Sequence, residues 1–115
     1  MEYDISMKRL IDKMLRGLGV EDKQQILTVL ALEKPILESR FRVRSLALFG
    51  SYARGDQQPG SDVDILVDVD PEIGLDFVSL ADWIEKLLGL PVDLVSSRAI
   101  KPKLYESIKG DLVYV

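Results

Sequence analysis

The sequence predicts an α/β domain in which helices pack against a single β-sheet, and three observations support this fold class. Helical and strand patterns interleave along the chain, as they do in sheet-and-helix sandwiches. A length of 115 residues is typical of one domain, and a hydrophobic content of 47% is enough for a core. No internal repeat, low-complexity tract or long linker divides the chain. We therefore expect residues 1–115 to form one domain.

The first elements that the pattern predicts are helices. Apolar residues recur at steps of three and four over residues 4–18, which indicates an amphipathic helix added at the N-terminus of the domain. A second helix is expected to begin at Asp22, a residue type that caps helix N-termini, and to bury Ile26 and Leu30. Pro35 is expected to divide this second helix, because proline disrupts a helix interior.

Two strands follow in the predicted order. The apolar run 45–49 indicates a buried strand that stops at Gly50, and a polar loop comes after it. From residue 62 the pattern alternates, with aliphatic residues on one face and aspartates on the other, which is typical of a strand. The aspartates of this face are Asp62, Asp64, Asp68 and Asp70.

The remaining chain continues the alternation of helix and strand. Residues 75–88 read as a helix closed by Gly89, and 92–95 read as a strand. A helix over 102–109 and a terminal strand over 112–115 complete the sheet.

The composition excludes several classes of chemistry. The chain has no cysteine and no histidine, which rules out disulfides, thiolate nucleophiles, Cys/His zinc sites and histidine-based triads. A metal would have to be bound by oxygen, which favours magnesium or manganese. The net charge of −4 disfavours general nucleic-acid binding. Charged residues interrupt every apolar run near the N-terminus, so we expect a cytoplasmic protein without a secretory leader or a membrane span.

The alternating strand is the first candidate site. Residues two apart on a strand project from the same face, so Asp62 and Asp64 should present two neighbouring carboxylates. Like charges at this spacing repel unless a cation lies between them, and a divalent cation fits such a pair. A solvated strand face would also carry aspartates, although aspartate is depleted in strands.

The segment from Gly50 to Arg54 is the second candidate site. A strand followed by Gly50-Ser51 and a helical turn exposes backbone N–H groups in an arrangement that binds phosphate. Arg54 would lie on the same side of such a turn, where it could pair with a phosphate. A plain strand-to-helix turn with a solvated arginine is the alternative interpretation.

Taken together, the two segments resemble a known family. Gly50-Ser51, ten further residues and then Asp62-x-Asp64 form the signature of the nucleotidyltransferase superfamily, which includes DNA polymerase β. Residues 48–55 (LFGSYARG) and 61–67 (SDVDILV) resemble the minimal nucleotidyltransferases, or MNT proteins, as does the tail from residue 91. The resemblance covers about 23–115.

This resemblance implies a fold, a chemistry and a set of site residues. The fold would be a single mixed sheet packed with helices, as in polymerase β-like nucleotidyltransferases. The reaction would transfer a nucleotide from ATP with the help of two Mg²⁺ ions, or Mn²⁺ ions. Gly50, Ser51 and Arg54 would bind the nucleotide phosphates, and Asp62, Asp64 and Asp93 would be the catalytic, metal-binding carboxylates. Asp68 and Asp70 match no catalytic position and are expected to be solvated or at the cleft rim.

The resemblance is strongest to the MntA-like antitoxins, which pair with a HEPN-domain RNase toxin. It implies transfer of AMP from ATP to a tyrosine of that toxin, in a hetero-oligomer. The helix expected over 4–18 would be a docking surface for that partner or, alternatively, would simply pack on the domain. Two alternatives remain open. The first is a nucleotidyltransferase that acts on a small molecule or a nucleic-acid end, and the second is an antitoxin that acts by binding alone.

Overall fold

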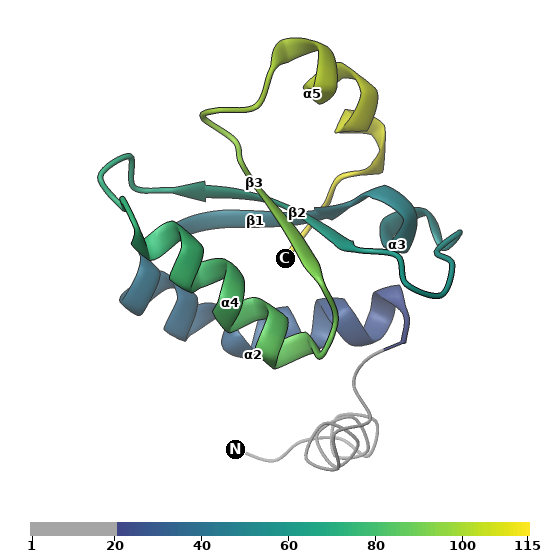
Figure 1. The fold of residues 1–115 in the computed structure, drawn as a ribbon, viewed down its shortest axis with the longest axis horizontal. Helices are drawn as coiled ribbons and strands as arrows, with labels where there is room; N and C mark the ends of the chain where they lie inside the picture. Colours follow the sequence, from purple (N-terminus) through teal and green to yellow (C-terminus); the bar gives the residue numbers. More distant parts are fainter. Residues whose placement is uncertain (1–20) are drawn as a thin grey trace.

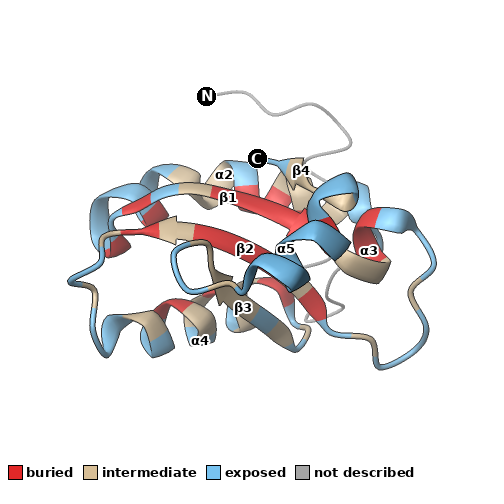
Figure 2. Cartoon of the chain, turned by 90° about the horizontal axis from the view of Figure 1, so that it is seen from above, coloured by how far each residue is buried: buried red, intermediate tan, exposed pale blue. Residues whose placement is uncertain are grey.

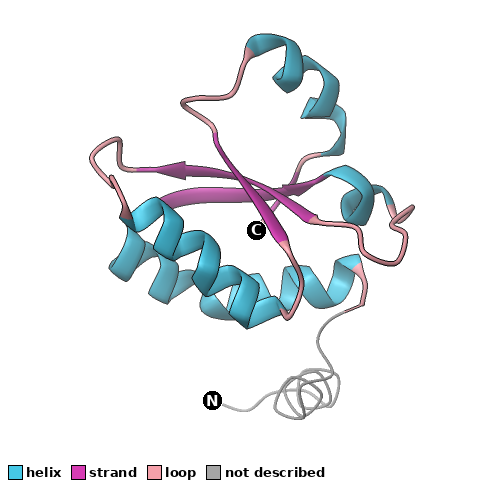
Figure 3. Cartoon of the chain, in the orientation of Figure 1, coloured by secondary structure: helices cyan, strands magenta, loops and turns pink. Residues whose placement is uncertain are grey.

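The computed structural model describes residues 21–115, in which helices and strands alternate as the sequence predicts (Figures 1 and 3). The helix expected over 4–18 lies outside the described residues. The elements run in the order α2 (Lys23–Phe41), β1 (Val43–Phe49), α3 (Gly50–Arg54), β2 (Val63–Val69), α4 (Asp76–Leu88), β3 (Val92–Ser96), α5 (Pro102–Ile108), the 3₁₀ helix η1 (Lys109–Asp111) and β4 (Val113–Tyr114).

The strands form one mixed sheet in the order β3-β2-β1-β4. Strand β1 is antiparallel to both β2 and β4, whereas β2 and β3 are parallel and are connected through α4. The predicted single mixed sheet is therefore confirmed, and it places β2, the aspartate-bearing strand, in the interior of the sheet.

Helices α2 and α4 cover one face of the sheet, and α5 lies on the other side (Figure 1). The main core lies between α2, α4 and the sheet, and the aliphatic face of β2 belongs to it through Val63, Ile65, Val67 and Val69. On the other side a small cluster joins Phe49 and Leu66 of the sheet to Ile108 of α5. Buried residues run along β1 and β2, while much of α5 is exposed (Figure 2). The aspartate face of β2 therefore looks toward the less covered side of the sheet.

Helix α2 confirms one prediction and corrects another. The Asp22 side chain accepts a hydrogen bond from the backbone N–H of Gln25 at 2.9 Å, which makes it the expected N-cap. The helix is not divided at Pro35, which lies inside a continuous helix of 19 residues. Leu37 and Phe41, beyond the proline, are buried in the main core, and this packing outweighs the hydrogen bond that proline cannot donate.

We expect the Pro35→Ala variant to raise the free energy of unfolding by about 1–2 kcal/mol, because alanine restores the missing backbone donor in the helix. The unfolded alanine variant has more conformational freedom than the unfolded parent chain, and this offsets part of the gain in the free energy of unfolding. Urea denaturation measures this difference. Ser39→Ala, at another exposed position of α2, serves as the control and should change stability by only a few tenths of a kcal/mol. A Pro35→Ala variant no more stable than this control would contradict the expectation.

The other element boundaries differ from the predictions by a few residues. Strand β1 begins at Val43 instead of residue 45, because the buried Val43 pairs with Val69 across an irregularity in the register. Helix α4 ends at Leu88 and is closed by Gly89 as predicted, and Gly89 adopts the left-handed conformation with φ of 69°. The last helix ends at Ile108 and passes into η1, which shortens the final strand to β4. None of the helices in residues 21–115 is long and apolar enough to cross a membrane.

Candidate active site

The two sequence segments meet where β1 passes into α3. Gly50 begins α3 with φ of +76°, a conformation that side chains rarely adopt. Its neighbour Phe49 is paired with Asp64 across β1 and β2. A Cβ atom at Gly50 would overlap the Asp64 carboxylate, with Oδ2 nearest and Cγ at 3.0 Å. The absence of a side chain at Gly50 therefore makes room for the Asp64 carboxylate.

Helix α3 is anchored to the core by its own buried residues, and its first turn lies next to Asp64 of β2. Tyr52 and Ala53 are buried in the main core. The Ser51 carbonyl accepts hydrogen bonds from the backbone N–H groups of Gly55 and Asp56, at 2.8 and 3.0 Å, and these bonds close the helix. Phe49, at the N-cap, offers no side-chain hydrogen bond to the first turn. Ser51 is half-buried and directly follows the glycine that contacts Asp64.

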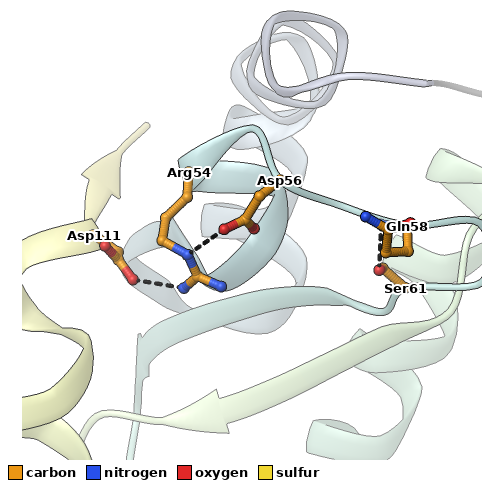
Figure 4. A network of polar contacts seen from close by, with 5 residues as sticks. All are labelled: Arg54, Asp56, Gln58, Ser61 and Asp111. Carbon is orange, nitrogen blue, oxygen red and sulfur yellow. Dashed lines mark hydrogen bonds and ion pairs between the residues drawn. The ribbon is translucent and has the colours of Figure 1, made fainter.

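A tight turn brings the chain back from α3 to the aspartates. Pro59 and Gly60 occupy its central positions, and the φ of +87° at Gly60 suits a type II turn. The backbone N–H of Ser61 donates to the Gln58 carbonyl at 3.0 Å. The Ser61 hydroxyl oxygen in turn accepts from the Gln58 backbone N–H at 2.9 Å (Figure 4). This turn fixes the position of Asp62, directly before β2 enters the sheet.

The three predicted carboxylates lie on neighbouring segments. Asp64 of β2 is in register with Asp93 of the parallel strand β3. Asp62 lies one residue before β2, and both Asp62 and Asp93 are exposed, whereas Asp64 is half-buried. Burial raises the pKa of Asp64, the charges of Asp93 and Asp62 raise it further, and the charge of Arg54 lowers it. The carboxylates therefore act on one another as a group of like charges.

The donor set suits a hard divalent cation. All three side chains offer carboxylate oxygens, and their mutual repulsion is relieved when a cation is bound. Within residues 21–115, no three acidic side chains converge on one point. Asp62 and Asp93 are exposed, so their side chains can change rotamer toward a cation without disturbing the core.

We expect the Asp64→Asn variant to be more stable than the parent chain at pH 7 without metal. The pKa of Asp64 is raised in the folded state, so its stabilising contribution is complete below the unfolded pKa and is lost as pH rises through the folded pKa. The amide should therefore raise Tm by a few degrees at pH 7, and the gain should vanish toward about pH 3. Thermal unfolding of both proteins at pH 7 and at pH 3, in a buffer that contains a chelator, measures the difference in Tm and its loss at low pH. Equal Tm values at pH 7 would contradict the expectation.

Asp68 and Asp70 stand apart from this group. Asp68 pairs with Arg98 at 3.3 Å, and Asp70 pairs with Arg42 at 3.4 Å. The backbone N–H of Glu72 lowers the pKa of Asp70, and the charge of Arg42 lowers it further. Both aspartates are half-buried in ion pairs rather than freely solvated, because each lies beside an arginine. Asp68 is therefore a matched control for Asp64 on the same strand.

Arg54 has two ion-pair partners, Asp56 and Asp111, that the sequence pattern did not indicate. Its Nε lies 3.1 Å from Asp56 Oδ2, and its Nη1 lies 2.9 Å from Asp111 Oδ2 (Figure 4). Asp56 is two residues from Arg54, so its proximity could have been inferred from the turn. Asp111 is 57 residues away, and no local pattern indicates that η1 meets α3. A contact of Arg54 with phosphate stays a prediction.

Comparison with known proteins assigns the family. A family model described as a nucleotidyltransferase domain matches residues 33–115. The chain belongs to the nucleotidyltransferase family. Protein adenylyltransferase MntA of Thermococcus cleftensis is 42% identical over 94 residues, which cover 80% of this chain and 94% of the relative. The chain is thus an MntA-like nucleotidyltransferase of the protein adenylyltransferase group.

Solved structures of the family support the same fold. A protein provisionally identified as a minimal nucleotidyltransferase superposes with a TM-score of 0.60 at 33% identity, over 81% of this chain and 95% of that one. A toxin–antitoxin structure with AMP-PNP matches with a TM-score of 0.53 at 28% identity, over 73% of this chain and 64% of that one. The predicted nucleotidyltransferase fold is therefore confirmed.

Proposed function

We propose that this nucleotidyltransferase transfers AMP from ATP to a tyrosine hydroxyl of a HEPN-domain RNase toxin, with release of pyrophosphate, and thereby acts as its antitoxin. The observation that supports the proposal best is the contact between Gly50 and Asp64. It puts Gly50, the start of the proposed phosphate-binding segment 50–54, against the carboxylate of Asp64, so that a nucleotide held by this segment would lie beside the carboxylates. Protein adenylyltransferases and a toxin–antitoxin structure with AMP-PNP are among the proteins that this chain resembles.

In this proposal each predicted residue has a role in holding or orienting the reactants. Gly50 and Ser51 hold the nucleotide phosphates at the start of α3, and Arg54 neutralises part of their charge. Asp62, Asp64 and Asp93 would hold Mg²⁺, which when bound neutralises phosphate charge and favours the ionised form of the attacking hydroxyl. Asp93, the exposed residue of the edge strand β3, would accept the proton of the incoming hydroxyl.

The acceptor is proposed to come from another protein. Residues 21–115 contribute one sheet and its covering helices, and within this part of the chain no second unit surrounds the carboxylates. The side of the sheet that carries Asp64 is only partly covered by α5 (Figure 2). A partner protein could therefore bring a tyrosine to Asp93 from the exposed side.

The proposal is tested by the intact mass of the protein that co-purifies with this chain, after incubation with ATP and Mg²⁺. One or more AMP groups on a tyrosine of the partner, absent with the Asp62→Ala or Asp64→Ala variant, are the expected result. If those variants neutralise the partner fully and no adduct forms on it, the chain acts by binding alone. An AMP adduct found only on a small molecule or a nucleic-acid end would point to the other alternative.

A further inference from the structure

The Arg54 side chain links the end of α3 to a segment that lies far away in the chain. Arg54 is the last residue of α3, Asp56 belongs to the following loop, and Asp111 is the last residue of η1. Figure 4 shows the guanidinium between the two carboxylates, with Nε directed at Asp56 and Nη1 at Asp111. The ion pair with Asp111 thus connects the phosphate-binding segment to the segment between α5 and β4.

The two carboxylates are not equivalent partners. The Asp111 side chain is 24% exposed and lies 2.9 Å from Arg54, whereas that of Asp56 is 60% exposed and lies 3.1 Å away. A less exposed and shorter ion pair is weakened less by solvent and salt. The residue after Asp111, Leu112, packs against the small cluster of Phe49, Leu66 and Ile108, which anchors the backbone next to Asp111. Asp111 is therefore the partner that can set the direction of the guanidinium.

The orientation of Arg54 matters because its helix reaches the carboxylate group. Arg54 ends α3, the short helix that Gly50 begins, and a Cβ atom at Gly50 would overlap the Asp64 carboxylate, so Arg54 lies about one helical turn from the proposed metal site. Its bonds to carboxylates of residues 21–115 use Nε and Nη1, which leaves Nη2 to donate to another anion. A guanidinium held from one side by Asp111 is already oriented when a phosphate arrives, so less side-chain freedom is lost on binding.

We propose that Asp111 is a positioning residue for the nucleotide, and that it acts by holding Arg54 toward the triphosphate. The proposal rests on the proposed function, since it assumes that ATP binds beside Gly50 and Ser51. Asp111 itself touches no reactant in this arrangement. Its loss should weaken nucleotide binding and leave the chemical step little changed.

The test measures binding of AMP-PNP with Mg²⁺ to the full chain by calorimetry, together with KM for ATP and kcat in the partner-transfer assay. We expect Asp111→Asn to weaken AMP-PNP binding and raise KM about tenfold, with kcat little changed. Asp111→Glu should restore part of the affinity. Glu106→Gln breaks the Glu106–Lys109 ion pair of 2.7 Å on the same segment without touching Arg54, and it should bind like the parent chain.

A double-mutant cycle decides whether Asp111 acts through Arg54. In an Arg54→Ala background, Asp111→Asn should cause no further loss of affinity. Additive losses, an unchanged affinity in Asp111→Asn, or a loss in kcat alone would overturn the proposal. If the parent chain binds AMP-PNP but transfers no AMP from ATP to its partner, the proposed function is refuted. The double-mutant cycle measured by AMP-PNP binding would still test the role of Asp111. A parent chain that binds no AMP-PNP would overturn both.

Discussion

The Asp64→Asn variant is expected to lower the rate of AMP transfer about a thousandfold or more, the largest effect that the structure predicts. Asp64 is half-buried, in register with Asp93, and in contact with the Gly50 backbone. An amide at this position keeps the shape of the side chain and removes the negative charge that would hold a divalent cation. Loss of one preorganised electrostatic group in a catalytic site typically costs about 10²–10³ in rate, and loss of a metal ligand adds to it.

The control for this variant is Asp68→Asn, on the same face of the same strand. Asp68 is engaged with Arg98 and lies outside the carboxylate group, so its replacement should leave transfer close to that of the parent chain. Single-turnover transfer at saturating ATP and Mg²⁺ measures both variants. Since Asp64→Asn is also expected to stabilise the metal-free fold, an inactive but more stable protein would separate loss of chemistry from loss of structure. Equal activity of the two variants would refute the role of Asp64.

The Gly50→Ala variant is expected to reduce transfer about a hundredfold and to destabilise the fold by about 1–2 kcal/mol. The stability loss follows from the φ of +76°, since an alanine in the left-handed region costs about that much. The activity loss follows from the new Cβ, which would force the Asp64 carboxylate away from its position. Small displacements of catalytic groups commonly cost about two orders of magnitude in rate.

Gly60→Ala separates these two causes. Gly60 has a similar φ of +87°, and an added Cβ there would meet nothing within 4 Å. This variant should show a comparable fall in Tm with nearly normal transfer. Thermal unfolding and the transfer assay, run side by side, measure both. If Gly60→Ala loses as much activity as Gly50→Ala, strain alone explains the effect and the contact with Asp64 is irrelevant to catalysis.

The sequence was most informative where short-range physical chemistry decides the structure. The N-cap at Asp22 and the helix end at Gly89 depend on neighbouring residues and were predictable. The alternation along β2 likewise predicted which side chains enter the core. The prediction that Pro35 divides the helix was wrong because burial of Leu37, a tertiary effect, decides whether the helix continues.

The candidate site was predictable in its residues and less so in its arrangement. The spacing of Gly50 and Asp64 pointed to a shared site through the family resemblance, but their direct contact depends on the pairing of β1 with β2. The register of Asp93 with Asp64 likewise depends on a parallel crossover through α4. The Arg54–Asp111 pair joins residues 57 apart, and such long-range pairs leave no periodic trace in a single sequence.

The alternating pattern of β2 has a consequence for how the chain finds its fold. A slip of one residue in the pairing of β2 would exchange the faces of the strand, since successive side chains point to opposite sides. Asp64 and Asp68 would then enter the core beneath α2 and α4, where Ile65 and Val67 now lie. Burial of unpaired carboxylates is far more costly than loss of a few aliphatic contacts. Asp64, which is proposed to hold the metal, and Asp68, which is not, therefore both penalise misregistered sheets during folding.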